Sequence, residues 1–357
     1  MEKKVLIKRG LPFLLFGFIV FLLYLYFFVG IPEILDIAQR TNPFYYSLAV
    51  ATLFVATAFY SLAWQRLLHL LRIKAVFKKT FSFVWIGGFV DLMIPAESFS
   101  GEISKIYLMS KDTGEDAGKV AASVVSHRIL TLATTMGAII VGSVFLLLGY
   151  ERSQTVANFM LFVAVCTITA ILSIIYLSLR PQATQKIAGW ITSFLSFISR
   201  GRWQLSRLRS QIKKMLSEFH QGMEILMTRP QSLISPFFFS TVAFSLDVLI
   251  SFLVFASLGV QISLNAILIV YTISNAIQTI PLGIPGEVGV TEILMTTLYT
   301  LLLPGLPPTE AAAASAAATL LIRIITVWLR ILVGYLAVHW VGLPVLFNAE
   351  AGKPVSS

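Results

Sequence analysis

The chain has little charge and a single cysteine, and both shortages narrow its class. Only 12% of its 357 residues are charged, whereas 57% are hydrophobic and the mean hydropathy is +0.84. This composition excludes a water-soluble globule. Cys166 lies in an apolar run, which excludes a disulfide framework and a cysteine-based metal site.

Motifs for nucleotide, metal and nucleic-acid chemistry are also missing. The sequence contains no Asp-x-Asp, no glycine-rich phosphate loop and no His-Glu-x-x-His. We therefore expect no metal and no cofactor. The net charge of +10 comes from lysines and arginines between apolar runs, where they indicate the cytoplasmic side and contact with anionic lipids. We expect no nucleic-acid partner.

Apolar runs of membrane length predict an all-α, polytopic integral membrane protein. The predicted full spans are about 11–30, 44–64, 120–149, 156–179, 233–257 and 309–340. Basic residues before the first span and throughout 180–229 place the N-terminus in the cytoplasm. Lys353 favours the same side for the C-terminus, and we expect a multi-pass protein of the cell (plasma) membrane.

Two interrupted segments, 81–110 and 264–303, lie between these spans. Each reads Ile-Pro and then Gly-Glu a few residues later. Proline removes a backbone donor and glycine loosens a helix, so each segment is predicted to be a broken helix. The predicted break residues are Pro95, Gly101, Pro281, Pro285 and Gly286.

The apolar part of the first segment, 81–96, would be roughly 24 Å long as a helix, shorter than the roughly 30 Å hydrocarbon core. Counting spans back from 180–229 puts both of its flanks in the cytoplasm. We therefore predict a re-entrant hairpin here and a second one, opening outward, at 264–303. Eight full spans are the alternative, because the second pair is almost long enough to cross.

These segments predict one transmembrane domain over 1–357, built as an inverted repeat. Its first half is 1–179, its second half is 230–345, and a basic insert, 180–229, lies between them. The insert has apolar residues at helical spacing, with arginines and lysines beside them. Such helices lie on a membrane surface or form a solvated connector packed on the cytoplasmic mouth.

Ionisable residues inside membrane segments are the candidate site, because an intramembrane charge costs several kcal/mol. Arg323, in the middle of the last span, is favoured because guanidinium groups bind phosphate. Arg128 and Arg330 lie nearer helix ends and can snorkel, and Arg330 is on roughly the same face as Arg323. The predicted substrate-binding residues are Glu102, Arg128, Glu287, Arg323, Asp91, Glu97, Asp247, Gln278 and Glu292.

A structural interpretation of the same residues stays open. Glu102 with Arg128, and Glu287 with Arg323, would then only neutralise each other within a polar core. Buried pairs of this kind often add little net stability.

Two pairs of motifs resemble a known family. SFSGEISKIYL followed by SHRIL, and IPGEVGVTEILM followed by LLIRIITVWLR, are similar to the lysylphosphatidylglycerol synthase transmembrane domain family, also called the UPF0104 group of flippase-like membrane proteins. The resemblance covers nearly the whole chain. It departs from the family pattern where Ser98–Ser100 replace an arginine-containing stretch and where His127 replaces a glutamate.

The resemblance implies a membrane domain that moves an anionic or aminoacylated phospholipid, or a polyprenyl-linked lipid, between leaflets. No soluble transferase domain follows Trp340, so we do not expect lysyl transfer. We predict a lipid flippase with a polar cavity between the two hairpins, and membrane lipids as partners, with an anionic or polyprenyl-phosphate lipid as cargo. Homo-oligomerisation stays open.

Two other functions remain as alternatives. An intramembrane lipid-modifying transferase would use an acid–base pair such as His127 with Glu97 or Glu102. A non-catalytic membrane scaffold would leave no distinct sequence trace.

Overall fold

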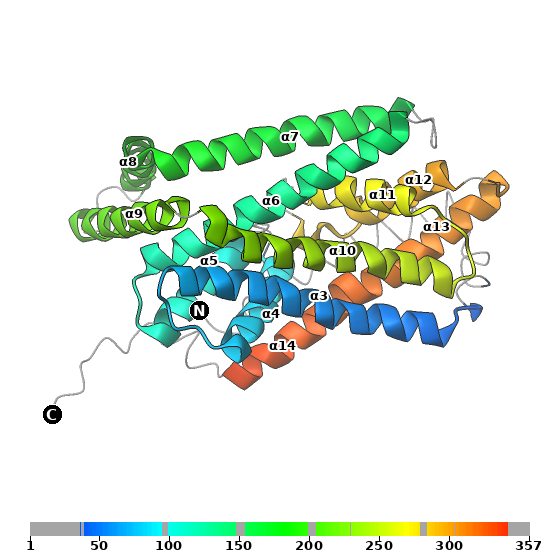
Figure 1. Ribbon diagram of the computed structural model, residues 1–357, viewed down its shortest axis with the longest axis horizontal. Coiled ribbons are helices and arrows are strands. Elements are labelled where there is room, and N and C mark those ends of the chain that lie inside the picture. Colours follow the sequence, from blue (N-terminus) through cyan, green and yellow to red (C-terminus); the bar gives the residue numbers. More distant parts are fainter. Residues whose placement is uncertain are drawn as a thin grey trace.

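The computed structural model describes residues 36, 39–94, 99–147, 154–198, 205–228, 230–278, 284–303 and 305–341. In these ranges the chain forms helices joined by short connections (Figure 1). Five helices in these ranges are long and apolar enough to cross a membrane: Pro43–Leu70, Ala117–Phe145, Val156–Leu179, Pro230–Ser257 and Pro308–Val341. The predicted all-α, polytopic membrane protein is confirmed. The predicted first span, 11–30, and both termini lie outside the described residues.

The first half has one long helix, two short helices and two further long helices. Its elements are α3 (Pro43–Leu70), α4 (Phe77–Met93), α5 (Phe99–Thr113), α6 (Ala117–Leu147) and α7 (Gln154–Leu179). The start of α3 is encoded locally, because the Asn42 side chain accepts a hydrogen bond from the Phe44 amide at 2.9 Å and Pro43 occupies the first helical turn.

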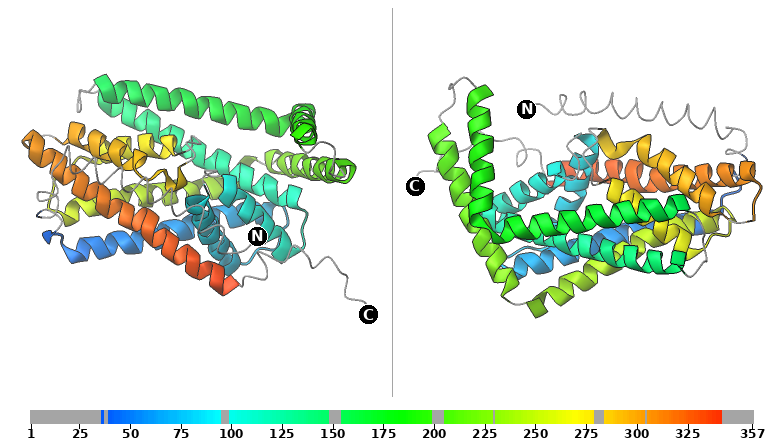
Figure 2. Two further views of the ribbon diagram at one scale, coloured as in Figure 1. Left: turned by 180° about the vertical axis from the view of Figure 1, so that it is seen from behind. Right: turned by 90° about the horizontal axis from the view of Figure 1, so that it is seen from above.

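The insert forms α8 (Pro181–Ile198) and α9 (Leu205–Met227), which project from one end of the bundle (Figure 2). Helix α9 packs against the start of α6, where a Cβ added at Gly222 would lie 2.7 Å from that of Ala122. Met223 and Leu226 are buried in the same core as Leu67 of α3. Packing of this extent favours the connector interpretation for α9, whereas Trp190 of α8 is 71% exposed.

The second half repeats the order of a long helix, a short pair and a long helix. Its elements are a short 3₁₀ turn η1 (Pro230–Leu233), α10 (Ile234–Ser257), α11 (Leu264–Ile277), the 3₁₀ turn η2 (Pro285–Glu287), α12 (Val290–Leu302), α13 (Pro308–Arg323), the π-helical segment η3 (Ile324–Leu329) and α14 (Arg330–Val341). Helices α13 and α14 run on through η3 as one long element across the bundle (Figure 1).

The corresponding long helices of the two halves, α3 and α10, pack along each other in opposite directions (Figure 1). At one end the Asn42 amide donates to the Ser257 carbonyl at 2.7 Å. At the other end the Arg66 guanidinium lies 5.9 Å from the Phe239 ring. In addition, α4 contacts α14 and α11 contacts α6, so a short helix of each half packs on a long helix of the other. This arrangement agrees with an inverted repeat.

The two short helices of the first half form a closed pair. Lys79 Nζ near the start of α4 lies 2.7 Å from Asp112 Oδ1 near the end of α5, so both outer ends are on the same side. Gly101, predicted to break the helix, instead lies inside the first turn of α5. A Cβ at Gly101 would clash with the Gly87 carbonyl and the Asp91 carboxylate, so the glycine is needed for close approach of the two helices.

Replacing Gly101 by alanine should therefore destabilise the protein. The added methyl group has no room against the α4 backbone, and overpacking of this kind costs about 1–3 kcal/mol. The unfolding temperature of purified protein in detergent measures the effect. Gly137→Ala is the matched control, because nothing lies within 4 Å of its added Cβ. Equal unfolding temperatures for the two variants would contradict the close packing of α4 and α5.

Candidate functional site

The ends of the two broken segments meet inside the bundle. Met93 at the end of α4 packs against Val288, just after η2; both are buried, and Phe89 and Ile331 pack against them. Helix α4 also contacts η2 directly. Of the predicted residues, Pro95, Glu97 and Pro281 lie outside the described residues. We call the contact between Met93 and Val288 the junction.

Asp91, two residues before Met93, holds α4 and α5 together. Its Oδ1 accepts a hydrogen bond from the Gly101 amide at 2.6 Å and one from the Ser100 hydroxyl at 2.9 Å. A carboxylate is stabilising there, because the first amides of a helix have no partner within the helix. Asp91 thus caps α5 from the neighbouring helix.

The structural interpretation paired Glu102 with Arg128, whereas the structure pairs Glu102 with Lys105. Its Oε2 lies 2.9 Å from Lys105 Nζ, one turn further along α5, although the two atoms lack the alignment of a hydrogen bond. Lys105 is 5% exposed, and its ammonium lies 5.4 Å from the ring centres of both Tyr60 and Trp64. Contact with aromatic faces stabilises such a buried cation. Lys105 was not among the predicted site residues, although its spacing of three from Glu102 was a usable signal.

His127 and Arg128 follow on α6, beside this cluster. The His127 side chain is 1% exposed, and its ring centre lies 4.2 Å from that of Tyr60. Its Nε2 has no hydrogen-bond partner among the described residues. Arg128 is half-buried, and its guanidinium forms no hydrogen bond or ion pair within the described ranges, so it remains available.

Arg323 and Glu292 clamp the second break. Arg323 Nε donates to Glu292 Oε1 at 2.6 Å, and its terminal nitrogen donates to the Gly286 carbonyl at 2.7 Å. The other oxygen of Glu292 accepts from the Gly289 amide at 2.6 Å. The structural interpretation paired Arg323 with Glu287, whereas the ion pair that the structure shows joins Arg323 to Glu292. Glu287 instead accepts from Thr291 at 3.3 Å, because α12 presents Glu292 toward α13.

The clamp stabilises a backbone that would otherwise be strained. Gly286, Glu287 and Gly289 have φ angles of 60°, 48° and 97°. Glycine adopts such angles freely, but a residue with a side chain pays roughly 1 kcal/mol or more. Since Arg323 binds the carbonyl of Gly286 and Glu292 binds the amide of Gly289, the two side chains hold the turn at both ends.

The π-helical segment separates Arg330 from Arg323. A π-helix has a wider turn than an α-helix, so residues seven apart no longer share a face. Arg323 faces α12, whereas the stem of Arg330 lies against α4, where a Cβ added at Gly88 would be 3.4 Å from its Cδ. The predicted common face for the two arginines is wrong for this reason.

Asp247 of α10 lies near Arg330. Its Oδ2 accepts from the Tyr271 hydroxyl at 3.3 Å, and both groups interact electrostatically with Arg330. Gln278 follows the last residue of α11, and its backbone amide donates to the Ser274 carbonyl at 3.0 Å. The structure thus separates the predicted residues into three groups. Glu102, with Lys105, Tyr60 and Trp64, forms what we call the first-break cluster. The other two are the clamped second break and a group around Arg330.

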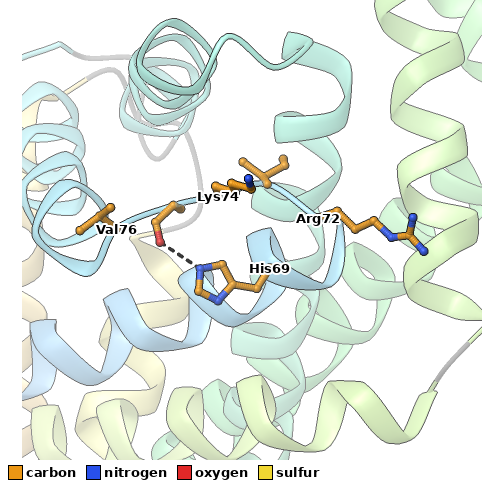
Figure 3. A pocket seen from close by; sticks show the side chains of 6 residues that line it. His69, Arg72, Lys74 and Val76 are labelled. Atoms are coloured by element: carbon orange, nitrogen blue, oxygen red, sulfur yellow. Dashed lines mark hydrogen bonds between the residues drawn. The ribbon is translucent and has the colours of Figure 1, made fainter.

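A shallow recess of about 430 Å³ lies elsewhere, at the connection between α3 and α4 (Figure 3). It is lined by residues from His69 to Val76, and His69 Nε2 lies 2.9 Å from the Ala75 carbonyl. The recess contains none of the predicted site residues. Within the described ranges, histidine, cysteine and acidic side chains form no group of three that would hold a metal ion.

Breaking the clamp should destabilise the protein strongly. Arg323→Met leaves Glu292 buried without its cation, and Glu292→Gln leaves Arg323 without its anion; loss of one partner of a buried pair costs about 3–5 kcal/mol. Arg323→Lys should not restore stability, because an ammonium cannot reproduce the two directed contacts.

Thermal unfolding of each variant in detergent measures this cost. Lys214→Met is the control, since Lys214 forms an exposed pair with Asp116 at 3.1 Å, and its unfolding temperature should not change. A wild-type unfolding temperature for Arg323→Met would show that the clamp does not hold the fold.

Comparison with known proteins agrees with this architecture. The family described as the lysylphosphatidylglycerol synthase TM region matches residues 14–334. A UPF0104 membrane protein of Methanothermobacter thermautotrophicus is 24% identical over 88% of this chain and 90% of its own length. UPF0104 membrane proteins of Pyrococcus horikoshii and Methanocaldococcus jannaschii are also 24% identical, over 87% and 94% of this chain and 91% and 95% of their own lengths.

No solved structure matches the chain. The family match extends from the predicted first span to α14, and so includes both broken segments and the clamp. The chain belongs to the family of the lysylphosphatidylglycerol synthase transmembrane region.

Proposed function

We propose that this protein moves a lipid between the two leaflets of the membrane, at the place where its broken segments meet. The observation that carries the proposal is the junction, where α4 of one half contacts η2 of the other. Irregular backbone at membrane depth is tolerated only where protein or a wet cavity surrounds it, and paired interrupted helices are typical of transport sites. The family is named for a synthase of a lipid, lysylphosphatidylglycerol, which favours a lipid cargo.

The short helices support re-entrant hairpins over eight full spans. Helices α4, α11 and α12 have 17, 14 and 13 residues, or roughly 26, 21 and 20 Å, whereas the hydrocarbon core is about 30 Å thick. The pair α4 and α5 opens to the side of Lys79, which is cytoplasmic by its basic flanks. The pair α11 and α12 opens to the other side. We place the protein in the cell membrane with both termini in the cytoplasm.

The available polar groups fit a passing headgroup. Arg128 lies beside the first-break cluster and has no partner within the described ranges, so it can bind an anionic headgroup while the acyl chains stay in the bilayer. Glu102 is the carboxylate of that cluster and is bound to Lys105. The clamp of Arg323 and Glu292 keeps the second break in place rather than binding cargo. Alternate exposure follows if the two halves rock about α3 and α10.

Locking the junction should stop transport. We expect the double variant Met93→Cys and Val288→Cys, made in a Cys166→Ser background, to lose lipid transport when oxidised and to regain it when reduced, because the halves can no longer separate. The measurement is movement of fluorescent phospholipids and polyprenyl phosphates in proteoliposomes. Each single-cysteine variant is a control and should be insensitive to oxidation.

Two results would contradict the proposal. Full transport by the oxidised double variant would show that the junction does not open. Transport of no lipid in the panel, together with turnover of a nucleotide sugar, would identify an intramembrane transferase instead.

A further inference from the structure

The geometry points to an anion site at Arg330 that takes a phosphate group. This site is separate from the first-break cluster and from the clamp, and it lies next to the junction: Ile331, the following residue, packs against the contact between Met93 and Val288. The inference rests on the proposed function only for the source of the phosphate, which is a phospholipid.

Arg330 is a cation without an acceptor among the described residues, on the last apolar helix. It is half-buried, and its guanidinium forms no hydrogen bond or ion pair with any part of the chain that the structure describes. A guanidinium carries five donors, and in a helix apolar enough to cross a membrane, donors without a polar partner are costly. Arg323, on the same long element, shows the contrast, since its donors are filled by Glu292 and Gly286. An anion from outside the chain would satisfy Arg330.

The neighbouring helix places no side chain against the stem of Arg330 at Gly88. Arg330 lies against Gly88 of α4, and an added Cβ there would be 3.4 Å from Arg330 Cδ. Gly88 thus covers the stem without a side chain that would reach the guanidinium. Because Met93 is five residues further along α4, a group bound to Arg330 would lie close to the junction.

Asp247 and Tyr271 lie within electrostatic reach of Arg330. Arg330 interacts electrostatically with both, yet no direct ion pair joins it to Asp247, whose Oδ2 accepts from the Tyr271 hydroxyl at 3.3 Å. The guanidinium can bind phosphate through two parallel contacts, and the Tyr271 hydroxyl can turn from the carboxylate to the phosphate. Asp247 would then repel the bound anion. Such repulsion keeps binding weak enough for a cargo to leave, as transport requires.

The test measures binding to the full-length protein in detergent by the shift of its unfolding temperature. The probes are dioleoyl phosphatidylglycerol, dioleoylglycerol, which has the same chains without phosphate, and inorganic phosphate. We expect phosphatidylglycerol to stabilise the wild type and dioleoylglycerol to have no effect. Arg330→Gln should abolish the shift, whereas the control Arg66→Gln, in an exposed arginine of α3, should keep it.

Asp247→Asn gives a result that a merely structural role would not produce. Its amide still accepts from Tyr271, but the repelling charge is gone, so the affinity for phosphatidylglycerol should rise about fivefold or more. Unchanged or weaker binding by Asp247→Asn, or an undiminished shift with Arg330→Gln, would overturn the anion site. If Arg330→Gln does not fold, Asp247→Asn decides alone.

Comparing lipid binding with lipid transport tests the anion site and the flippase function separately. An Arg330-dependent shift with inorganic phosphate equal to that with phosphatidylglycerol would keep the anion site and identify a free phosphate as its ligand. Arg330-dependent lipid binding without transport in proteoliposomes would keep the site and overturn the flippase. Transport with no dependence of binding on Arg330 would do the reverse.

Discussion

The clamp between Arg323 and Glu292 is the interaction on which the rest of the site depends. It joins α13 to α12 and binds the backbone on both sides of the second break, at Gly286 and Gly289. The turn has positive φ angles at Gly286, Glu287 and Gly289, which a regular helix cannot follow, so side chains supply partners for its backbone groups. With the turn held, Val288 reaches Met93 and the two halves meet.

The two halves solve the same backbone problem with different residues. In the first half, Asp91 on α4 caps α5 at Gly101, and the glycine lets the helices approach. In the second half, Glu292 of α12 accepts from the Gly289 amide, and Arg323 of the following long element donates to the Gly286 carbonyl. Both solutions supply side-chain partners for backbone groups at the breaks, which a membrane environment demands. The exchange of contacts, α4 with α14 and α6 with α11, then joins the halves.

The cations of the bundle differ in whether their donors are filled. Lys105 is enclosed by two rings and Glu102, and Arg323 is enclosed by the clamp. Arg128 and Arg330 keep free donors within the described ranges, one beside the first-break cluster and one beside the junction. A path past both would let an anionic headgroup pass from one guanidinium to the other. The π-helical segment turns Arg330 away from the clamp, and this makes the Arg330 guanidinium available.

From the sequence alone, hydrophobic periodicity and the positions of proline, glycine and basic residues determined the long helices, both interrupted segments and the family, because these depend on local chain chemistry and on the thickness of a bilayer. Only the tertiary structure decided the partners. Glu102 binds Lys105 one turn along α5, a pair that spacing could have indicated. Arg323 binds Glu292 because contacts between helices choose among nearby charges, and a π-helical segment changed which face Arg330 presents. Spacing along one helix cannot report the neighbour that packs against it, and that neighbour determines whether a buried charge is bound or free.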